Sequence, residues 1–243
     1  NSGPFIGTSI PYQNGYDGSG IIVSIIDTGI DLNHPDLEGQ IIGGYDFVDN
    51  DEIPEDTNGH GTQVAGIIAS NGNLKGIAPN SKILMYKVSE DGESVPSHLI
   101  IKAIEKSIED GADIINISLG INQTNTKIDQ AVNKAVKNNI FVVTAAGNFG
   151  PELNTIGSPG INPNAITVGA TFNNVTSSLV STFEIEDKTF NVFPMVGTQA
   201  LIEPITSQII FGKYGKVNDL LENDVKGSIL LIERGSDIEN EII

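Results

Sequence analysis

A carboxylate and an imidazole each occupy a place in this 243-residue sequence where they could carry acid–base chemistry. Asp27 directly follows an apolar run and opens an Asp-Thr-Gly triplet, whereas His60 lies between two glycines at the start of a helical pattern. Glycine lets the backbone approach a partner closely, and the positive potential of a helix N-terminus opposes premature protonation of the ring. A histidine in this setting is suited to act as a base.

The triplet at Asp27 has two other interpretations. An aspartate after a strand can simply cap a turn. Asp-Thr-Gly also marks the pepsin-like aspartic proteases, in which two carboxylates share a proton. Because the sequence contains a single Asp-Thr-Gly, such a pair of carboxylates would require a homodimer.

The elements that must position these side chains alternate along the chain. Short, β-branched apolar runs predict buried strands over residues 21–26, 84–88, 114–117 and 140–144. Apolar residues at helical spacing predict helices over residues 61–70, 96–110 and 127–138. Buried strands that alternate with helices indicate an α/β fold with a parallel sheet, whose sites usually form beyond the carboxyl ends of the strands.

The character of the sequence changes from about residue 182 onward. Helical periodicity weakens there, and aromatic residues interleave with polar ones, which predicts a β-rich second unit. We therefore expect a first domain over residues 1–185 and part of a second, β-rich domain over residues 186–243.

The composition excludes several classes of function. Thirteen Lys and Arg against 31 Asp and Glu give a formal net charge of −18, which repels the nucleic-acid backbone. The longest apolar runs fall far short of the roughly 20 residues that a membrane helix needs. With no cysteine, the chain cannot use a thiolate nucleophile or a thiolate zinc site, and no Gly-x-Gly-x-x-Gly motif follows a predicted strand. We expect no nucleic-acid partner and no membrane span.

Two further segments complete a pattern. Ser118, Leu119 and Gly120 follow the strand predicted over 114–117, and an Ala-Ala-Gly-Asn segment that ends at Asn148 follows the strand predicted over 140–144. Together with Asp-Thr-Gly and His-Gly-Thr, in this order, the sequence over residues 20–170 resembles the subtilisin-like serine proteases. The resemblance implies their three-layer architecture around a parallel sheet and a serine endopeptidase activity.

The resemblance also implies roles for single residues. Asp27 would orient His60, which would be the general base toward a serine. Asn148 would donate its side-chain N–H to the oxyanion. The residues that would bind an extended polypeptide substrate are Ser118, Leu119, Gly120, Ala146, Gly147 and Gly157. The last of these would leave a roomy pocket for the side chain before the scissile bond.

The sequence departs from the family at the nucleophile. No Gly-Thr-Ser-Met-Ala segment occurs, and Gly-Thr-Gln-Ala at residues 197–200 matches it only superficially, because glutamine is not a nucleophile. Residues 224–235 resemble the protease-associated domain, a β-rich insertion that many large extracellular subtilases carry before the serine. We therefore expect the N-terminal portion of a larger protease, inactive alone, with its C-terminal remainder as a partner. The alternative is a pseudoprotease or a non-catalytic peptide-binding module.

The same resemblance bears on cofactors and location. In the family an aspartate at the place of Asp36 joins a loop before Gly76 to bind calcium, but here this loop spans only residues 71–75. It lacks room for several oxygen ligands. We expect no metal and no other cofactor. The resemblance implies a secreted or cell-surface protein.

Overall fold

The computed structural model describes residues 3, 6–92, 95–150, 152–170, 181–185, 188–192, 203, 205–213 and 225–232. The chain divides into two compact units, residues 1–172 and 173–243. Each unit is described by itself.

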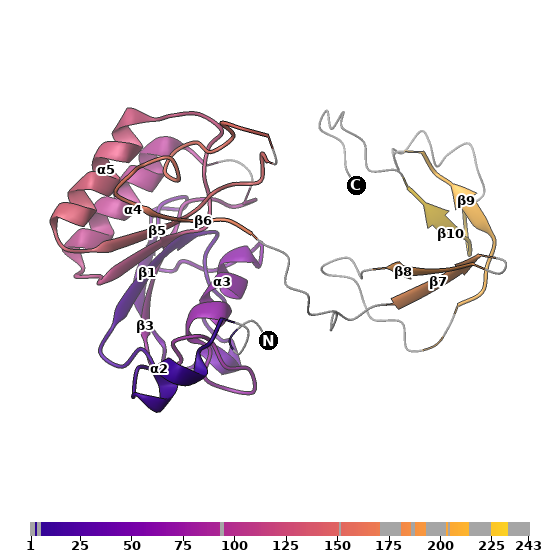
Figure 1. Cartoon of the computed structure of the whole chain (residues 1–243), viewed down its shortest axis with the longest axis horizontal. Helices are drawn as coiled ribbons and strands as arrows, with labels where there is room; N and C mark the ends of the chain where they lie inside the picture. The colour runs from indigo at the N-terminus through magenta and orange to yellow at the C-terminus, as the bar shows by residue number, and fades with distance from the viewer. Residues whose placement is uncertain are drawn as a thin grey trace. The chain divides into compact units, whose positions relative to one another are not determined.

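Six parallel strands form the sheet of the first unit, in the order β2-β3-β1-β4-β5-β6 (Figure 1). The strands are β1 (Ile22–Asp27), β2 (Ile41–Asp46), β3 (Lys82–Lys87), β4 (Ile114–Ile117), β5 (Phe141–Ala145) and β6 (Ile166–Val168). Strand β1 lies between β3 and β4. Strands β2 and β3 lie on one side of β1, and β4, β5 and β6 lie on the other. The carboxyl ends of β1 and β4 therefore flank the topological switch point, where parallel sheets bind ligands.

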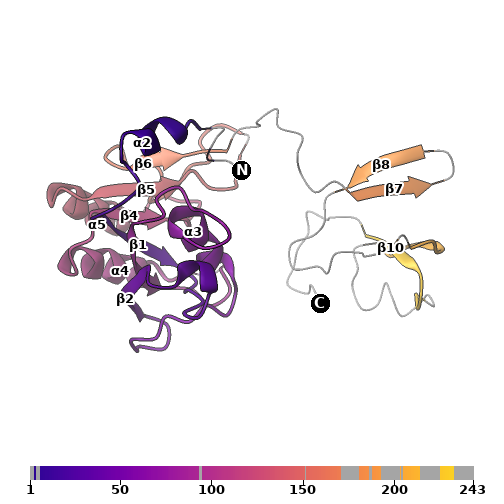
Figure 2. The same cartoon turned by 90° about the horizontal axis from the view of Figure 1, so that it is seen from below.

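Helices cover both faces of this sheet and give the three layers that the sequence predicts. Helix α3 (His60–Ala69) lies on one face, and α4 (Ser97–Glu109) and α5 (Thr126–Lys137) lie on the other (Figures 1 and 2). The short helix α2 (Ser9–Gln13) precedes β1, and the 3-10 turn η1 (Pro35–Leu37) precedes β2. The expected α/β fold is confirmed.

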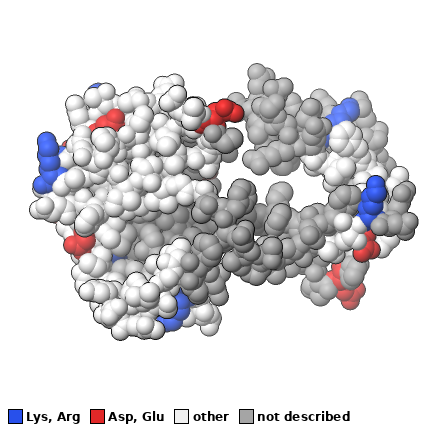
Figure 3. Space-filling view, viewed as in Figure 1, with Lys and Arg blue, Asp and Glu red and all other residues white. Residues whose placement is uncertain are grey.

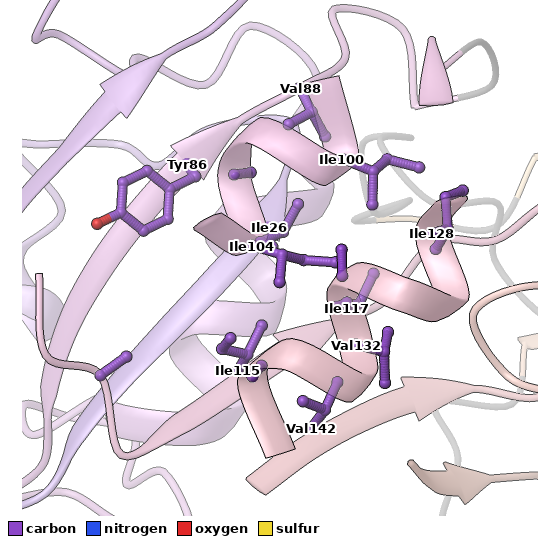
Figure 4. Close-up of a cluster of buried hydrophobic side chains, with 14 of the residues drawn as sticks. Ile26, Tyr86, Val88, Ile100, Ile104, Ile115, Ile117, Ile128, Val132 and Val142 are labelled. Carbon is purple, nitrogen blue, oxygen red and sulfur yellow. The ribbon is translucent and has the colours of Figure 1, made fainter. Parts of the chain in front are cut away.

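Two apolar cores hold these layers together. In the larger core, Ile100 and Ile104 of α4 pack with strand residues such as Ile26 and Ile115, all of them fully buried (Figure 4). In the smaller core, Ile25 packs with side chains of α3 on the opposite face. Successive side chains of a strand point to opposite faces, so a strand covered on both sides needs an apolar residue at nearly every position. The run before Asp27 is apolar for this reason.

Two strands of the sheet give no apolar run in the sequence. Strand β2 contains Gly43 and Gly44, and a Cβ on Gly44 would lie 2.0 Å from the carbonyl oxygen of Met85 on β3. Glycine is therefore needed where these two backbones approach. Strand β6 has only three residues, two of them exposed, and pairs with β5 alone. Sequence periodicity cannot detect strands of this kind.

The regular structure among the described residues of the second unit consists of strands. Strands β7 (Ser181–Ile185) and β8 (Lys188–Val192) pair antiparallel, and β9 (Ile209–Phe211) pairs parallel with β10 (Ile229–Leu231). The two compact units meet between residues 172 and 173. The domain boundary expected between residues 185 and 186 stays a prediction. Residues 197–200 and the ends of the 224–235 segment lie outside the described residues.

Two findings concern the charge and hydropathy of the described residues. On the face shown in Figure 3, the charged side chains of the first unit stand scattered and form no basic patch among the described residues. No helix in the described part of the chain is long and apolar enough to cross a bilayer.

Candidate active site

The predicted acid–base pair meets at the switch point of the sheet. Asp27 is the last residue of β1, and His60 is the first residue of α3. The His60 Nδ1 atom lies 2.6 Å from the Asp27 Oδ1 atom, a hydrogen-bond distance. The Asp27 side chain is 1% exposed, whereas the His60 side chain is 49% exposed. The pair therefore has a buried carboxylate behind an accessible imidazole.

Glycines and backbone bonds fix the start of α3 against β1. Gly59, the N-cap of α3, has a left-handed backbone with φ of 102°. The Gly61 backbone N–H donates to the Thr28 hydroxyl at 2.9 Å, and a Cβ on Gly61 would lie 2.1 Å from the carbonyl oxygen of Gly29. Residues with a side chain are strained at the first position and would collide at the second. The glycines that flank His60 thus bring its ring to Asp27.

Burial dominates the electrostatics of the Asp27 carboxyl. Desolvation raises its pKa, and hydrogen bonds from His60 and from the Thr28 backbone N–H lower it, so that the pKa lies above the ordinary value of 3.8. Among the described residues, its Oδ2 atom is buried and accepts no hydrogen bond. Holding this group ionised costs folding free energy, as is common at catalytic sites.

A cleft of about 490 Å³ opens in front of this pair. The predicted site residues that line it are Asp27, His60, Ser118, Leu119, Gly120, Gly147 and Asn148. They come from the carboxyl ends of β1, β4 and β5 and from the start of α3. The structure thus brings seven of the nine predicted site residues to one cleft.

Ala146 and Gly157 are the two predicted site residues that are not among the described residues lining the cleft. The Ala146 backbone N–H donates to the Val168 carbonyl oxygen at 2.9 Å and extends the sheet. A Cβ on Gly157 would lie 1.9 Å from the Ile121 carbonyl oxygen. Glycine at 157 thus permits close packing against the backbone of residues 121–123. Its role in a substrate pocket stays a prediction.

Replacing Gly157 with alanine should therefore destabilise the first unit. The added methyl group would force apart two backbones that are joined by hydrogen bonds between Ile121 and Ser158 and between Ser158 and Gln123. Overpacking of this kind costs about 1–3 kcal/mol of unfolding free energy, which thermal unfolding would measure. The matched control is Gly66→Ala in α3, where a Cβ would meet nothing within 4 Å. This variant should not destabilise the fold. Equal melting temperatures for the two variants would contradict this account.

Sequence reasoning missed several residues of the cleft: Thr28, Ser89, Gly92, Val95, Ala145 and Phe149. Ser89 and Phe149 follow the carboxyl ends of β3 and β5 closely, so the rule that led to Asp27 could have found both. Gly92 and Val95 lie in the connection from β3 to α4, where no local pattern marks them.

The carboxylate of Asp36 is engaged by the protein itself. Its Oδ1 accepts the Asn73 backbone N–H at 2.8 Å, and its Oδ2 accepts the Leu74 backbone N–H at 3.1 Å. These bonds hold its pKa below the ordinary value. In the described part of the chain no group of three or more His, Cys, Asp or Glu side chains could hold a metal ion. That the protein needs no calcium remains a prediction.

Comparisons with known proteins identify the family of the chain. Residues 18–202 match the Subtilase family. The chain is 36% identical to the Minor extracellular protease Vpr of Bacillus subtilis over 97% of its own length and 31% of Vpr. It is 37% identical to the Major intracellular serine protease of the same organism, over 91% of this chain and 71% of that protein.

A solved structure shares the fold. The crystal structure of a cold adapted subtilisin-like serine proteinase matches with a TM-score of 0.60 and 35% identity, over 65% of this chain and 57% of that one. The chain thus spans less than a third of Vpr and little more than half of the solved chain. Its matched residues, its fold and its relatives lead to one conclusion: the chain belongs to the subtilase family.

Proposed function

We propose that this chain supplies two members of the catalytic triad of a subtilisin-type serine endopeptidase, with the nucleophilic serine on sequence outside these 243 residues. The observation that carries the proposal is the 2.6 Å contact between a buried Asp27 and an accessible His60 at the switch point of the sheet. Membership of the subtilase family supports it. The serine would approach the cleft from the side of the exposed imidazole.

The contact with Asp27 supports a definite proton chemistry for His60. An ionised Asp27 can only accept a hydrogen bond, so His60 Nδ1 carries the proton and Nε2 keeps its lone pair. His60 Nε2 would take the proton of the serine hydroxyl as the serine oxygen bonds to the substrate carbonyl carbon. The protonated ring would then give this proton to the leaving amine as the peptide bond breaks, and the acyl-enzyme would be hydrolysed by a water that His60 deprotonates.

The substrate of this reaction would be an extended polypeptide. Ser118, Leu119 and Gly120 follow β4 without regular structure of their own and line the cleft. Their backbone would pair with a substrate strand. Val95, Leu119 and Phe149 make part of the lining apolar, which favours apolar substrate side chains.

Asn148 would donate to the oxyanion of the tetrahedral intermediate. It follows β5 by three residues and lines the cleft with an exposed side chain. Asn148→Ala should lower kcat about 10²- to 10³-fold, a magnitude that comes from removal of the corresponding donor in a subtilisin. Steady-state kinetics should show KM nearly unchanged, because the bond forms in the transition state. The control is Asn164→Ala, outside the cleft, and an equal loss in both variants would count against this role.

We also propose that residues 186–243 belong to an inserted protease-associated domain and that the protein is secreted. The strands of the second unit support the first statement, and the likeness to an extracellular protease supports the second. Mass spectrometry of the culture medium and of the cell fraction would test secretion.

The class of inhibitor tests the proposed activity. The protein that contains this chain and its serine should hydrolyse a denatured polypeptide near neutral pH and lose this activity to a fluorophosphonate. A statine-type inhibitor, which acts on paired carboxylates, should have no effect. Inhibition by the statine-type compound with an acidic optimum would instead assign Asp27 to an aspartic protease dimer.

A further inference from the structure

One carboxylate next to the catalytic pair accepts an unusual number of hydrogen bonds. Asp56, four residues before His60, receives five donors. Its Oδ1 accepts from the Thr28 hydroxyl at 3.0 Å and from the backbone N–H groups of Asn58 and Gly59 at 3.1 and 2.8 Å. Its Oδ2 accepts from the Thr62 backbone N–H at 2.9 Å and from the Thr62 hydroxyl at 2.5 Å.

The direction of these bonds is fixed by their neighbours. The Thr28 hydroxyl already accepts the Gly61 backbone N–H at 2.9 Å, and the Thr62 hydroxyl accepts the Asp31 backbone N–H at 2.8 Å. Each hydroxyl has one proton, and in both cases it points to Asp56. Five donors converge on two oxygens, and only an ionised carboxylate can accept all of them.

These donors belong to the segments that carry the two catalytic side chains. Thr28 follows Asp27, and Gly59 precedes His60. The Thr28 hydroxyl also binds Gly61, the residue after His60. Asp56 thus reaches the backbone on both sides of His60 and the turn that holds Asp27. We propose that Asp56 is a positioning residue that fixes the distance and orientation of His60 relative to Asp27, an inference that rests on the proposed function of this pair.

The loop that carries Asp56 is itself anchored. The buried Lys87 side chain donates to the Glu55 carbonyl oxygen at 3.0 Å and pairs with Glu90 at 2.7 Å. Glu90 in turn accepts the Thr57 hydroxyl at 2.6 Å. The residues on either side of Asp56 are therefore bonded to residues at the end of β3 and just after it. These bonds fix the position of Asp56, which in turn bonds to the start of α3.

The ionisation of Asp56 agrees with this role. Burial raises its pKa, but the bonds from Thr62, Gly59 and Thr28 lower it more, so the pKa lies below the ordinary value of 3.8. A carboxyl with a depressed pKa contributes stability above its unfolded-state pKa and loses it only as the pH falls through the folded-state value. Asp56 therefore keeps its five bonds throughout the neutral range in which His60 would act.

Asp56→Asn is the sharpest test. The asparagine amide has the same shape as the carboxylate, but an NH2 group replaces one of the two acceptor oxygens and would face N–H donors. In either orientation of the amide, at least one backbone N–H, that of Gly59 or of Thr62, would lose its acceptor. The control is Asp31→Asn, which removes a nearby charge while its Oδ1 can still accept the Asn33 backbone N–H. A second pair, Thr28→Val and Thr28→Ser, removes and restores the hydroxyl that links Asp56 to Gly61.

The first readout is the far-downfield proton resonance of His60 Nδ1–H in the 243-residue chain, which reports the bond to Asp27 without any catalysis. We expect Asp56→Asn and Thr28→Val to shift or abolish this resonance, and Asp31→Asn and Thr28→Ser to keep it. In the protein that includes the serine, Asp56→Asn should lower kcat about 10- to 100-fold with KM changed less than twofold.

An unchanged resonance in both Asp56→Asn and Thr28→Val, with folding verified by circular dichroism, would overturn the proposal. If Asp56→Asn fails to fold, the two Thr28 variants decide. The resonance can be measured without any activity. If the wild-type protein proves inactive but Asp56→Asn and Thr28→Val still lose the resonance, the proposed function fails and the positioning role of Asp56 stands.

Discussion

Replacing His60 with alanine should abolish peptide hydrolysis, with a loss in kcat of about 10⁶-fold. The imidazole is the one group of the described cleft that can take a proton from a serine near neutral pH and return it to the leaving amine. Members of a triad act as a unit, so removing the base costs about as much as removing the whole triad. Burst and steady-state kinetics with a chromogenic peptide ester and amide would measure the loss.

The control for His60→Ala is His98→Ala, because His98 is exposed on α4 and does not line the cleft. This variant should keep wild-type kinetics. A His60→Ala enzyme that retains more than one hundredth of the activity would show that another group acts as the base.

Asp27→Asn should lower kcat about 10⁴-fold and at the same time stabilise the fold. An asparagine can keep its oxygen toward Thr28 N–H and His60, but it no longer requires the tautomer with the proton on Nδ1. The stability gain follows from the raised pKa of Asp27, which burial causes. A buried neutral amide costs less than a buried charge with an unpaired oxygen, so we expect a gain of about 0.5–2 kcal/mol at pH 7.

The pH dependence gives this prediction a definite sign. A carboxyl whose folded-state pKa lies above its unfolded-state value binds more protons when folded, so the free energy of unfolding falls as the pH rises through this window. The advantage of Asp27→Asn should therefore be largest at neutral pH and vanish below the ordinary carboxyl pKa of 3.8. Urea unfolding at pH 7 and at pH 3.5 measures both limits. If Asp27→Asn were less stable than wild type at pH 7, the attractive interactions of the ionised Asp27 carboxylate would outweigh the cost of its desolvation.

The sequence predicts that Asp27 and His60 lie close together, and the structure places them in contact, because strand burial and glycine placement are local signals. An apolar run that ends at Asp27 and two glycines around His60 identify the end of one element and the start of another, and parallel topology brings such ends together. By contrast, the role of Asp56 depends on a contact between two separated segments. Four of its five donors are local, from Asn58, Gly59 and Thr62, but the fifth is the Thr28 hydroxyl. The local sequence around Asp56 does not show this link to the turn after Asp27.

Gly157 shows a second limit. A glycine in a predicted substrate-binding segment suggests open space, yet the structure places it where the backbone of Ile121 leaves no room for a methyl group. Strand β2 is not predicted for a similar reason, since Gly44 interrupts its apolar pattern where its backbone approaches β3. A glycine can leave open space or allow two backbones to approach closely. Which of the two applies depends on the segment that packs against it, and the local sequence does not contain this segment.

Fluorophosphonate labelling followed by peptide mapping would show whether His60 activates a serine outside residues 1–243. The wild-type protein and His60→Ala are treated in parallel, and the modified serine is identified by mass spectrometry. We predict a single phosphonylated serine outside residues 1–243, with labelling lost in His60→Ala. A label on Ser118 or Ser89, the two described serines that line the cleft, would contradict the account, as would peptide hydrolysis that persists with no serine labelled.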